Sequence, residues 1–205
     1  DYVTGSPGVT QRLGATFVAP AASRHLTPHR AVVDGDEIAL GERARMVAIA
    51  TPGHTPDHHA FLLQHDGSPE VLFSGGSLMV GAVGRTDLCG EDLAEPMARE
   101  MFRSVRRLLD ELPDDVTVAP THGAGSFCSV GAGSQRTTTI GAERRSPLLS
   151  TTDETVFVES LLSTYGSFPD YFRSLPEVNR RGPRTFAAVP ELRRLTVDQF
   201  DAVRA

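Results

Sequence analysis

The stretch TPGHTPDHH, residues 51–59, is the most informative part of this sequence. A Pro-Gly pair breaks the backbone directly before His54. Residues 45–50 (RMVAIA) lead into the stretch and residues 60–63 (AFLL) lead out of it, and both have the apolar pattern of buried strands. A histidine on a tight loop between two buried strands is held rigidly, which is how proteins usually present a metal ligand. The alternative interpretation is a histidine that only caps the turn.

The composition limits the classes of function. The chain has 205 residues, of which 40% are hydrophobic and 22% charged, as in ordinary globular proteins. Its net charge of -6 argues against a nucleic-acid or anionic membrane surface. No apolar run approaches the roughly 18–20 residues of a membrane span, and no signal peptide is recognisable. Two cysteines, Cys89 and Cys128, do not make a disulfide framework, so we expect a reducing cytoplasm.

Hydrophobic periodicity and turn residues predict an α/β protein. Strands are expected at residues 15–19, 37–40, 44–50, 60–63, 70–74 and 116–119. Helices are expected at residues 7–13, 93–112 and 151–165, the last with Val156, Phe157, Leu161, Leu162 and Tyr165 inward. A loop or short helix is expected at residues 21–30, and a long loop rich in Gly, Ser and Thr at residues 123–141.

Two histidines follow predicted buried strands. His54 comes after residues 45–50, and His122 comes after residues 116–119, 68 residues further on. A Gly-Gly-Ser loop at residues 75–77 follows another predicted strand. Strand ends that meet at one edge of a sheet commonly build the functional site of an α/β sandwich. We therefore expect His54 and His122 to belong to one site.

The chain resembles the metallo-β-lactamase fold superfamily, and within it the persulfide dioxygenase and glyoxalase II branch. The similar stretches are TPGHTPDHHAFLL (51–63), LFSGGSLMVGAVGRTDL (72–88), VAPTHGAGSFC (118–128) and TIGAERRSP (139–147). The Gly-Arg-Thr-Asp run at 84–87 and the Glu-Arg-Arg run at 143–145 point to the persulfide dioxygenase side. The resemblance implies an αββα sandwich whose N-terminal part is incomplete.

The resemblance also implies a metal site with His54, His122 and Asp1 as ligands, where Asp1 and Tyr2 would end the family motif His-x-His-x-Asp-His. The family's third motif is Gly-Asp-Thr, but Gly76 stands in place of its metal-binding aspartate. Persulfide dioxygenases hold one iron with two histidines and a carboxylate. If a preceding segment supplies two histidines, they and His54 would instead suit zinc. We therefore expect a single iron or zinc ion, and a Gly76→Asp change is expected to raise iron affinity if the site is merely degraded.

Several other residues have two interpretations. His58 is expected either to support the metal ligands or to lie in the core. Arg85 and Asp87 are expected to form a buried pair that fixes their loop, with a substrate contact by Arg85 as the alternative. Tyr171 and Asn179 are expected to line the mouth of the cleft. Cys128 is either a thiol that faces the cleft or a small buried hydrophobe.

The end of the chain suggests its partners. Residues 1–189 are expected to form the metallo-β-lactamase-like domain, and residues 190–205 resemble a linker and the entry into a rhodanese domain of the same polypeptide. The resemblance further implies a small thiol-derived substrate and, since dimers are common in this branch, a homodimer. Three functions remain open: oxidation of a glutathione-type persulfide, zinc-dependent hydrolysis of a thioester, and an inactive module beside a sulfurtransferase domain.

Overall fold

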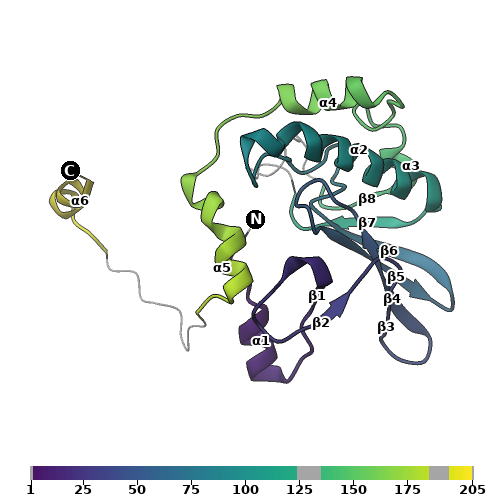
Figure 1. The fold of residues 1–205 in the computed structure, drawn as a ribbon, viewed down its shortest axis with the longest axis horizontal. Coiled ribbons are helices and arrows are strands. Elements are labelled where there is room, and N and C mark those ends of the chain that lie inside the picture. Colours follow the sequence, from purple (N-terminus) through teal and green to yellow (C-terminus); the bar gives the residue numbers. More distant parts are fainter. Residues whose placement is uncertain (1, 124–134, 185–193, 205) are drawn as a thin grey trace.

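A six-stranded sheet forms the centre of the protein (Figure 1). It is seen in a computed structural model that describes residues 2–123, 135–184 and 194–204. The strand order is β3-β4-β5-β6-β7-β8, and neighbours run antiparallel except for the parallel pair β6 and β7. The strands are β3 (Glu37–Ala39), β4 (Ala44–Ala50), β5 (His59–His65), β6 (Ser68–Gly75), β7 (Thr117–Pro120) and β8 (Thr138–Thr139).

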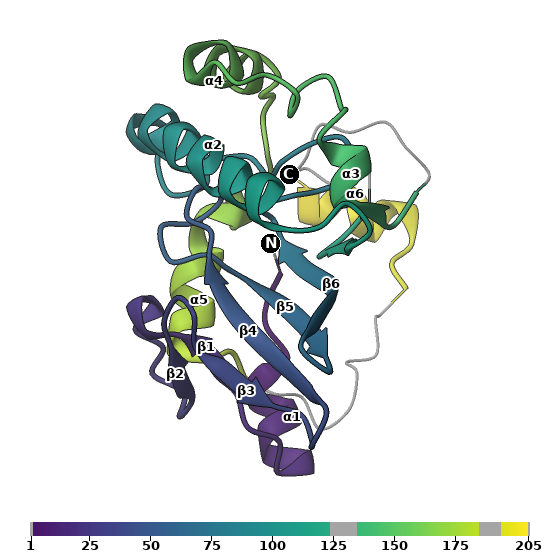
Figure 2. The same ribbon diagram turned by 90° about the vertical axis from the view of Figure 1, so that its right-hand side faces the viewer.

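Strands β4, β5 and β6 form a meander that confirms three of the predicted strands (Figure 2). Strands β5 and β6 turn at Asp66 and Gly67, which both have positive φ. Leu62 of β5 pairs with Leu72 of β6, which pairs with Val118 of β7, and all three side chains are buried. Residues directly opposite on neighbouring strands share one face of a sheet, so this row marks the core side.

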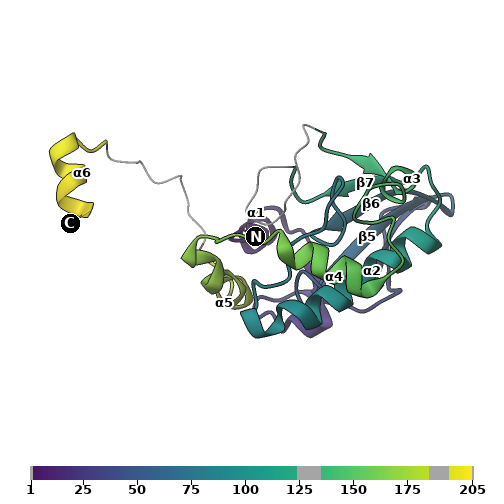
Figure 3. The same ribbon diagram turned by 90° about the horizontal axis from the view of Figure 1, so that it is seen from above.

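Helices cover this core side (Figure 3). The 3-10 turn η2 (Glu91–Leu93) leads into α2 (Ala94–Glu111), and α3 (Ile140–Glu143) and α4 (Glu154–Ser163) pack beside it. The predicted helix at residues 93–112 is confirmed by α2, in which Met101, Val105 and Leu108 are buried. In α4 the prediction was wrong in one position. Asp153 caps this helix through two backbone N–H groups, its buried side chains are Phe157, Val158 and Leu161, and Val156 points outward.

The opposite side of the sheet is less covered. Phe61 and Phe73 pair across β5 and β6 on this side, and Phe73 is 45% exposed. The described residues therefore form one helix layer and one sheet of a sandwich, together with a small two-stranded sheet. That sheet pairs β1 (Val18–Pro20) with β2 (Arg30–Val32) in parallel.

The remaining elements lie outside the large sheet. They are α1 (Ser6–Leu13), η1 (Ala21–Ser23), η3 (Asp170–Ser174), α5 (Leu175–Arg181) and α6 (Val197–Arg204). Strand β2 was not predicted, since residues 21–30 were expected to be a loop or short helix. The predicted loop at 123–141 contains β8 and the start of α3, while residues 124–134 lie outside the described part. Among the described residues, no helix is both long and apolar enough to cross a bilayer.

Candidate functional site

The loop between β4 and β5 is fixed against helix α2. Gly53 has φ 145°, and a Cβ at this position would lie 2.6 Å from the Cα of Met101, so only glycine allows this approach. The hydroxyl of Ser104 on α2 donates to the carbonyl of Pro52 at 2.7 Å. The Pro-Gly pair of the sequence thus seats the loop on the helix and presents the next residue, His54.

The imidazole of His54 has a defined orientation. Its Nδ1 lies 2.8 Å from the carbonyl oxygen of Arg85, which places the ring proton on Nδ1 and the lone pair on Nε2. The residue is only 5% exposed, and burial lowers its pKa to about 4. A neutral imidazole whose Nδ1 donates to a carbonyl is the usual form of a metal-binding histidine. His54 therefore fits the role of a ligand.

Two glycines form a slot around the ring of His54. A Cβ at Gly76 would lie 2.4 Å from Cδ2 of His54, and a Cβ at Gly84 would lie 2.8 Å from its Nδ1. The two glycines are themselves joined, since the N–H of Gly84 donates to the carbonyl of Gly76 at 2.8 Å. The position expected to carry the ligand aspartate thus has no space for a side chain in this arrangement. The geometry therefore argues against the expectation that Gly76→Asp raises iron affinity.

The ring of His58 links the loop after β4 to the loop that contains Gly76. Its Nε2 accepts the backbone N–H of Gly76 at 3.1 Å, and its Nδ1 lies 2.8 Å from the hydroxyl of the buried Thr51. Burial of the ring, followed by the charge of His54, lowers the pKa of His58 to about 3. Since both ring nitrogens are used within the protein, the supporting role is the interpretation that the geometry favours.

His122 lies at the same end of the sheet. Strands β6 and β7 are parallel there, with Gly75 opposite Pro120 and the N–H of Thr121 donating to the carbonyl of Gly75 at 3.1 Å. The Nδ1 of His122 lies 2.9 Å from the carbonyl of Gly123, and the ring of Tyr2 stands edge-on to it at 6.2 Å. Burial is the main cause of the lowered pKa of His54, and the charge of His122 also lowers it.

The expected third ligand, Asp1, lies outside the described residues, as does Cys128. Within residues 2–123, 135–184 and 194–204, no group of three or more His, Cys, Asp or Glu side chains could hold a metal ion. His54 fits a metal, but the described part of the chain does not complete the coordination.

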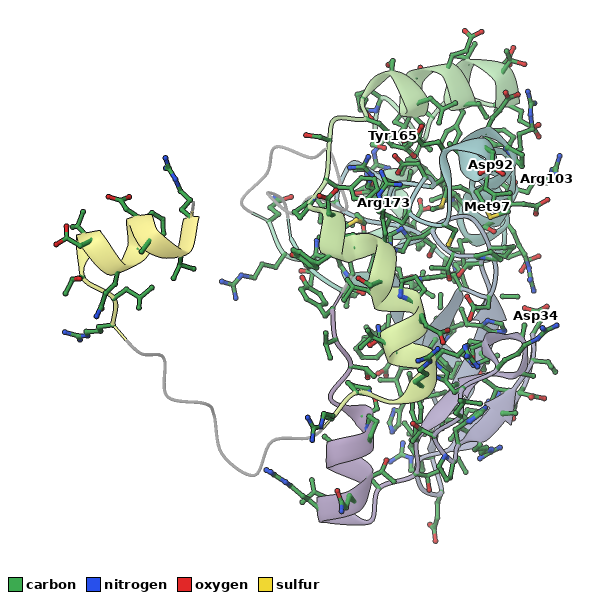
Figure 4. All side chains as sticks on the ribbon, turned by 60° about the vertical axis from the view of Figure 1, so that its left-hand side comes forward. Asp34, Asp92, Met97, Arg103, Tyr165 and Arg173 are labelled. Carbon is green, nitrogen blue, oxygen red and sulfur yellow. The ribbon has the colours of Figure 1, made fainter. Side chains whose placement is uncertain are left out.

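A cleft of about 680 Å³ opens above His54. One wall is the β4–β5 loop with Asp57, and the facing wall is α5 with the turn before it. The lining residues are Ala22, Ser23, His25, His54, Thr55, Pro56, Asp57, Leu88, Cys89, Phe172, Arg173, Leu175, Pro176, Glu177, Asn179 and Arg180. Figure 4 shows Arg173 at the upper end of α5. A mixed apolar and charged lining of this size suits a small organic molecule.

Solved structures decide the fold family. A metallo-beta-lactamase from Staphylococcus aureus subsp. aureus COL superposes on 93% of this chain, and on 58% of its own, with a TM-score of 0.82 and 29% identity. The chain has the metallo-β-lactamase fold. No protein-family model matches the sequence.

Two named relatives are similar to part of this chain. The hydroxyacylglutathione hydrolase of Chromohalobacter salexigens is 35% identical over 122 residues, which is 60% of this chain and 44% of the relative. The mitochondrial persulfide dioxygenase ETHE1 of Homo sapiens is 32% identical over 134 residues, which is 62% of this chain and 46% of the relative. The chain thus spans less than half the length of either relative.

The structure also places the remaining predicted residues of this metallo-β-lactamase fold. The guanidinium of Arg85 donates to both carboxylate oxygens of Asp87, at 2.6 and 2.7 Å, so the expected buried pair is present. Asn179 lines the cleft as expected. Tyr171 is 59% exposed and packs on the ring of Phe172, and it is not among the described residues that line the cleft.

Arg173 and Cys89 are among the cleft residues that were missed from the sequence. Burial and the charge of Asp57 raise the pKa of the Cys89 thiol, so it stays protonated at neutral pH and is a poor nucleophile. No local pattern marks either residue, because each reaches the cleft only through the packing of distant segments.

The two buried histidines predict a pH dependence of stability. Both have folded pKa values, about 4 and about 3, below the ordinary 6.5, so the unfolded chain binds more protons between pH 6.5 and 4. For the metal-free protein, we expect the free energy of unfolding in urea to be constant above pH 6.5. Below it, each histidine should remove on the order of 1 kcal/mol per pH unit.

Replacing His58 with glutamine should reduce this slope by about half, while His65→Gln, at a half-exposed site, should leave it unchanged. Equal slopes in the wild type and His58→Gln would refute the assignment.

Proposed function

We propose that the intact protein is a metal-dependent enzyme that acts on a sulfur-linked derivative of a small thiol. The observation that carries this proposal is His54, a buried neutral imidazole with its Nδ1 on the Arg85 carbonyl at the base of the cleft. Both relatives' names support the substrate class, since one is a hydrolase of hydroxyacylglutathione and the other a dioxygenase of persulfides.

Within this class, Gly76 favours hydrolysis. A mononuclear iron oxygenase site uses two histidines and one carboxylate, and position 76 supplies no carboxylate and has no space for one. If a preceding segment supplies two histidines, they and His54 would leave one coordination position open, an arrangement that suits zinc. Zinc would polarise a bound carbonyl and lower the pKa of a bound water. We therefore place zinc-dependent hydrolysis of a thioester first, with iron-dependent persulfide oxidation as the second candidate.

The second candidate has its own support. The persulfide dioxygenase matches over 134 residues, a longer stretch than the hydrolase. The loop from Gly84 to Asp87, which resembles that branch, provides the carbonyl that orients His54.

The chain's own residues would bind and orient the substrate. Phe172, Leu175 and Leu88 give the cleft an apolar surface for the acyl or alkyl part. Arg173 stands at the cleft with its guanidinium 5.3 Å from the ring centre of Phe168, and its described acidic partner, Glu91, is 3.9 Å away. Such a loosely paired cation suits a carboxylate of a small thiol compound.

The deciding experiment is elemental analysis of the intact protein, followed by assays with S-lactoylglutathione and with glutathione persulfide. We expect about one zinc per chain and thioester hydrolysis. His54→Ala should weaken zinc binding at least about tenfold, and His65→Ala should not. One iron with oxygen uptake would favour the second candidate, whereas no metal above background would leave an inactive module.

The domain and partner expectations stay proposals. We propose a metallo-β-lactamase domain at residues 1–189 and, from residue 190, the approach to a rhodanese domain of the same polypeptide. The helix α6, with Phe200 exposed on it, supports the second boundary. A homodimer would be tested by light scattering of the intact protein.

A further inference from the structure

The side-chain amide of Asn179 holds the first described residues of the chain. Its Oδ1 accepts the backbone N–H of Thr4 at 2.9 Å, and its Nδ2 donates to the carbonyl of Tyr2 at 2.7 Å. A single amide thus pairs with the backbone on both sides of residue 3, as a neighbouring strand would. The two partners are 175 and 177 residues away in sequence.

The backbone around Asn179 is fixed to a second segment. The Nδ1 of His25 lies 3.1 Å from the carbonyl oxygen of Asn179, and the N–H of Leu26 donates to the carbonyl of Arg180 at 2.8 Å. These contacts use carbonyls at the C-terminal end of α5, where the carbonyl of Asn179 also accepts the N–H of Gly182 at 3.2 Å. The end of α5 is therefore tied to residues 25–26 by its backbone and to residues 2–4 by one side chain.

The segment held by Asn179 reaches the candidate site. Tyr2 places its ring edge-on to His122 at 6.2 Å. Asn179 also lines the cleft above His54. The side chain of Asn179 thus connects the N-terminal segment beside His122 with the wall of the cleft that faces His54.

We propose that Asn179 is a positioning residue of the candidate metal centre. By holding the backbone of Tyr2 and Thr4, it sets the place of the N-terminal segment beside His122 and makes this segment and α5 move together. Substrate binding against α5 would then also position the segment next to the metal. This inference rests on the proposed metal-dependent function.

Asparagine suits this role for a chemical reason. The backbone offers one donor, at Thr4, and one acceptor, at Tyr2, and a side-chain amide complements both at once through two separate atoms. Aspartate keeps an acceptor for Thr4 but loses the donor to Tyr2, and leucine of similar size loses both. The backbone contacts to His25 and Leu26 remain available in every variant.

The test compares Asn179→Leu and Asn179→Asp with Arg181→Ala in the intact protein. Arg181 lies on the same helix, is exposed, and has its described ion pair with Glu177. In Asn179→Leu we expect the amide of Thr4 to exchange its hydrogen at least about tenfold faster and zinc to bind at least about tenfold more weakly. Asn179→Asp should show a smaller effect of the same kind, and it carries the test if the leucine variant does not fold. Arg181→Ala should match the wild type in both measurements.

Two results would overturn the inference. One is an unchanged exchange rate at Thr4 in Asn179→Leu, and the other is faster exchange with unchanged zinc affinity. If the wild type binds neither zinc nor iron, the proposed function fails, and the inference is judged by the NMR signals of the His122 ring. Asn179→Leu must then shift these signals through the displaced ring of Tyr2 while Arg181→Ala does not, and unshifted signals would overturn the inference.

Discussion

Gly76→Asp is expected to destabilise the protein and to lower its metal affinity, although it restores the residue that related metal sites carry. A Cβ at position 76 would lie 2.4 Å from Cδ2 and 2.8 Å from Cγ of His54. His54 cannot retreat easily, because Gly84 closes the other side of its ring and the Arg85 carbonyl holds its Nδ1. Inserting atoms into a filled space costs about 1–3 kcal/mol, and burying an unpaired carboxylate adds to this cost.

We therefore expect Gly76→Asp to lower the free energy of unfolding, measured in urea, by at least about 3 kcal/mol. The variant should also bind less zinc or iron than the wild type. Gly166→Ala is the matched control, since a Cβ at Gly166 meets nothing within 4 Å. It should change stability by less than about 0.5 kcal/mol. A stable Gly76→Asp protein with one tightly bound iron would show instead that the slot around His54 adapts.

The slot around His54 illustrates the limit of the sequence. The strand–loop–strand pattern around residues 51–59 is local, so periodicity and the Pro-Gly break located His54 correctly. The absence of a carboxylate at Gly76 was also visible. That Gly76 and Gly84 enclose the ring depends on a contact among residues 54, 76 and 84, and no local pattern carries such a contact.

The far wall of the cleft shows the same limit. Helix α5 contains Pro176 and follows a short 3-10 turn, so its seven residues are too few for a periodic signal. Asn179 was expected at the cleft from the family resemblance, but its bonds to Tyr2 and Thr4 join segments that lie 177 and 175 residues apart in the sequence. Strand β2 pairs with β1 over only three residues, which is also below what alternation can reveal.

The second large effect is expected from Arg85→Met. The guanidinium of Arg85 binds Asp87 through two hydrogen bonds, donates to the carbonyl of Gly166 at 2.8 Å, and lies 4.5 Å from the ring centre of Phe168. Both charged side chains are largely enclosed. Removing one partner of a buried ion pair leaves the other charge uncompensated, which costs about 3–5 kcal/mol. We expect a loss of this size in urea unfolding, together with weaker metal binding, because the carbonyl of residue 85 orients His54.

A double-mutant cycle separates the ion pair from the rest. Arg85→Met combined with Asp87→Leu should be less destabilised than the sum of the single variants by about 2 kcal/mol, since it leaves no unpaired charge. The matched control is Arg43→Met, whose partner is Asp66 on an exposed hairpin. Exposed pairs contribute about 0–1 kcal/mol, so this control should barely change the free energy of unfolding. Arg85→Met could instead prove no more destabilising than Arg43→Met. The loop from Gly84 to Asp87 would then hold its shape without the ion pair of Arg85 and Asp87, and the slot formed by Gly76 and Gly84 would alone fix the ring of His54.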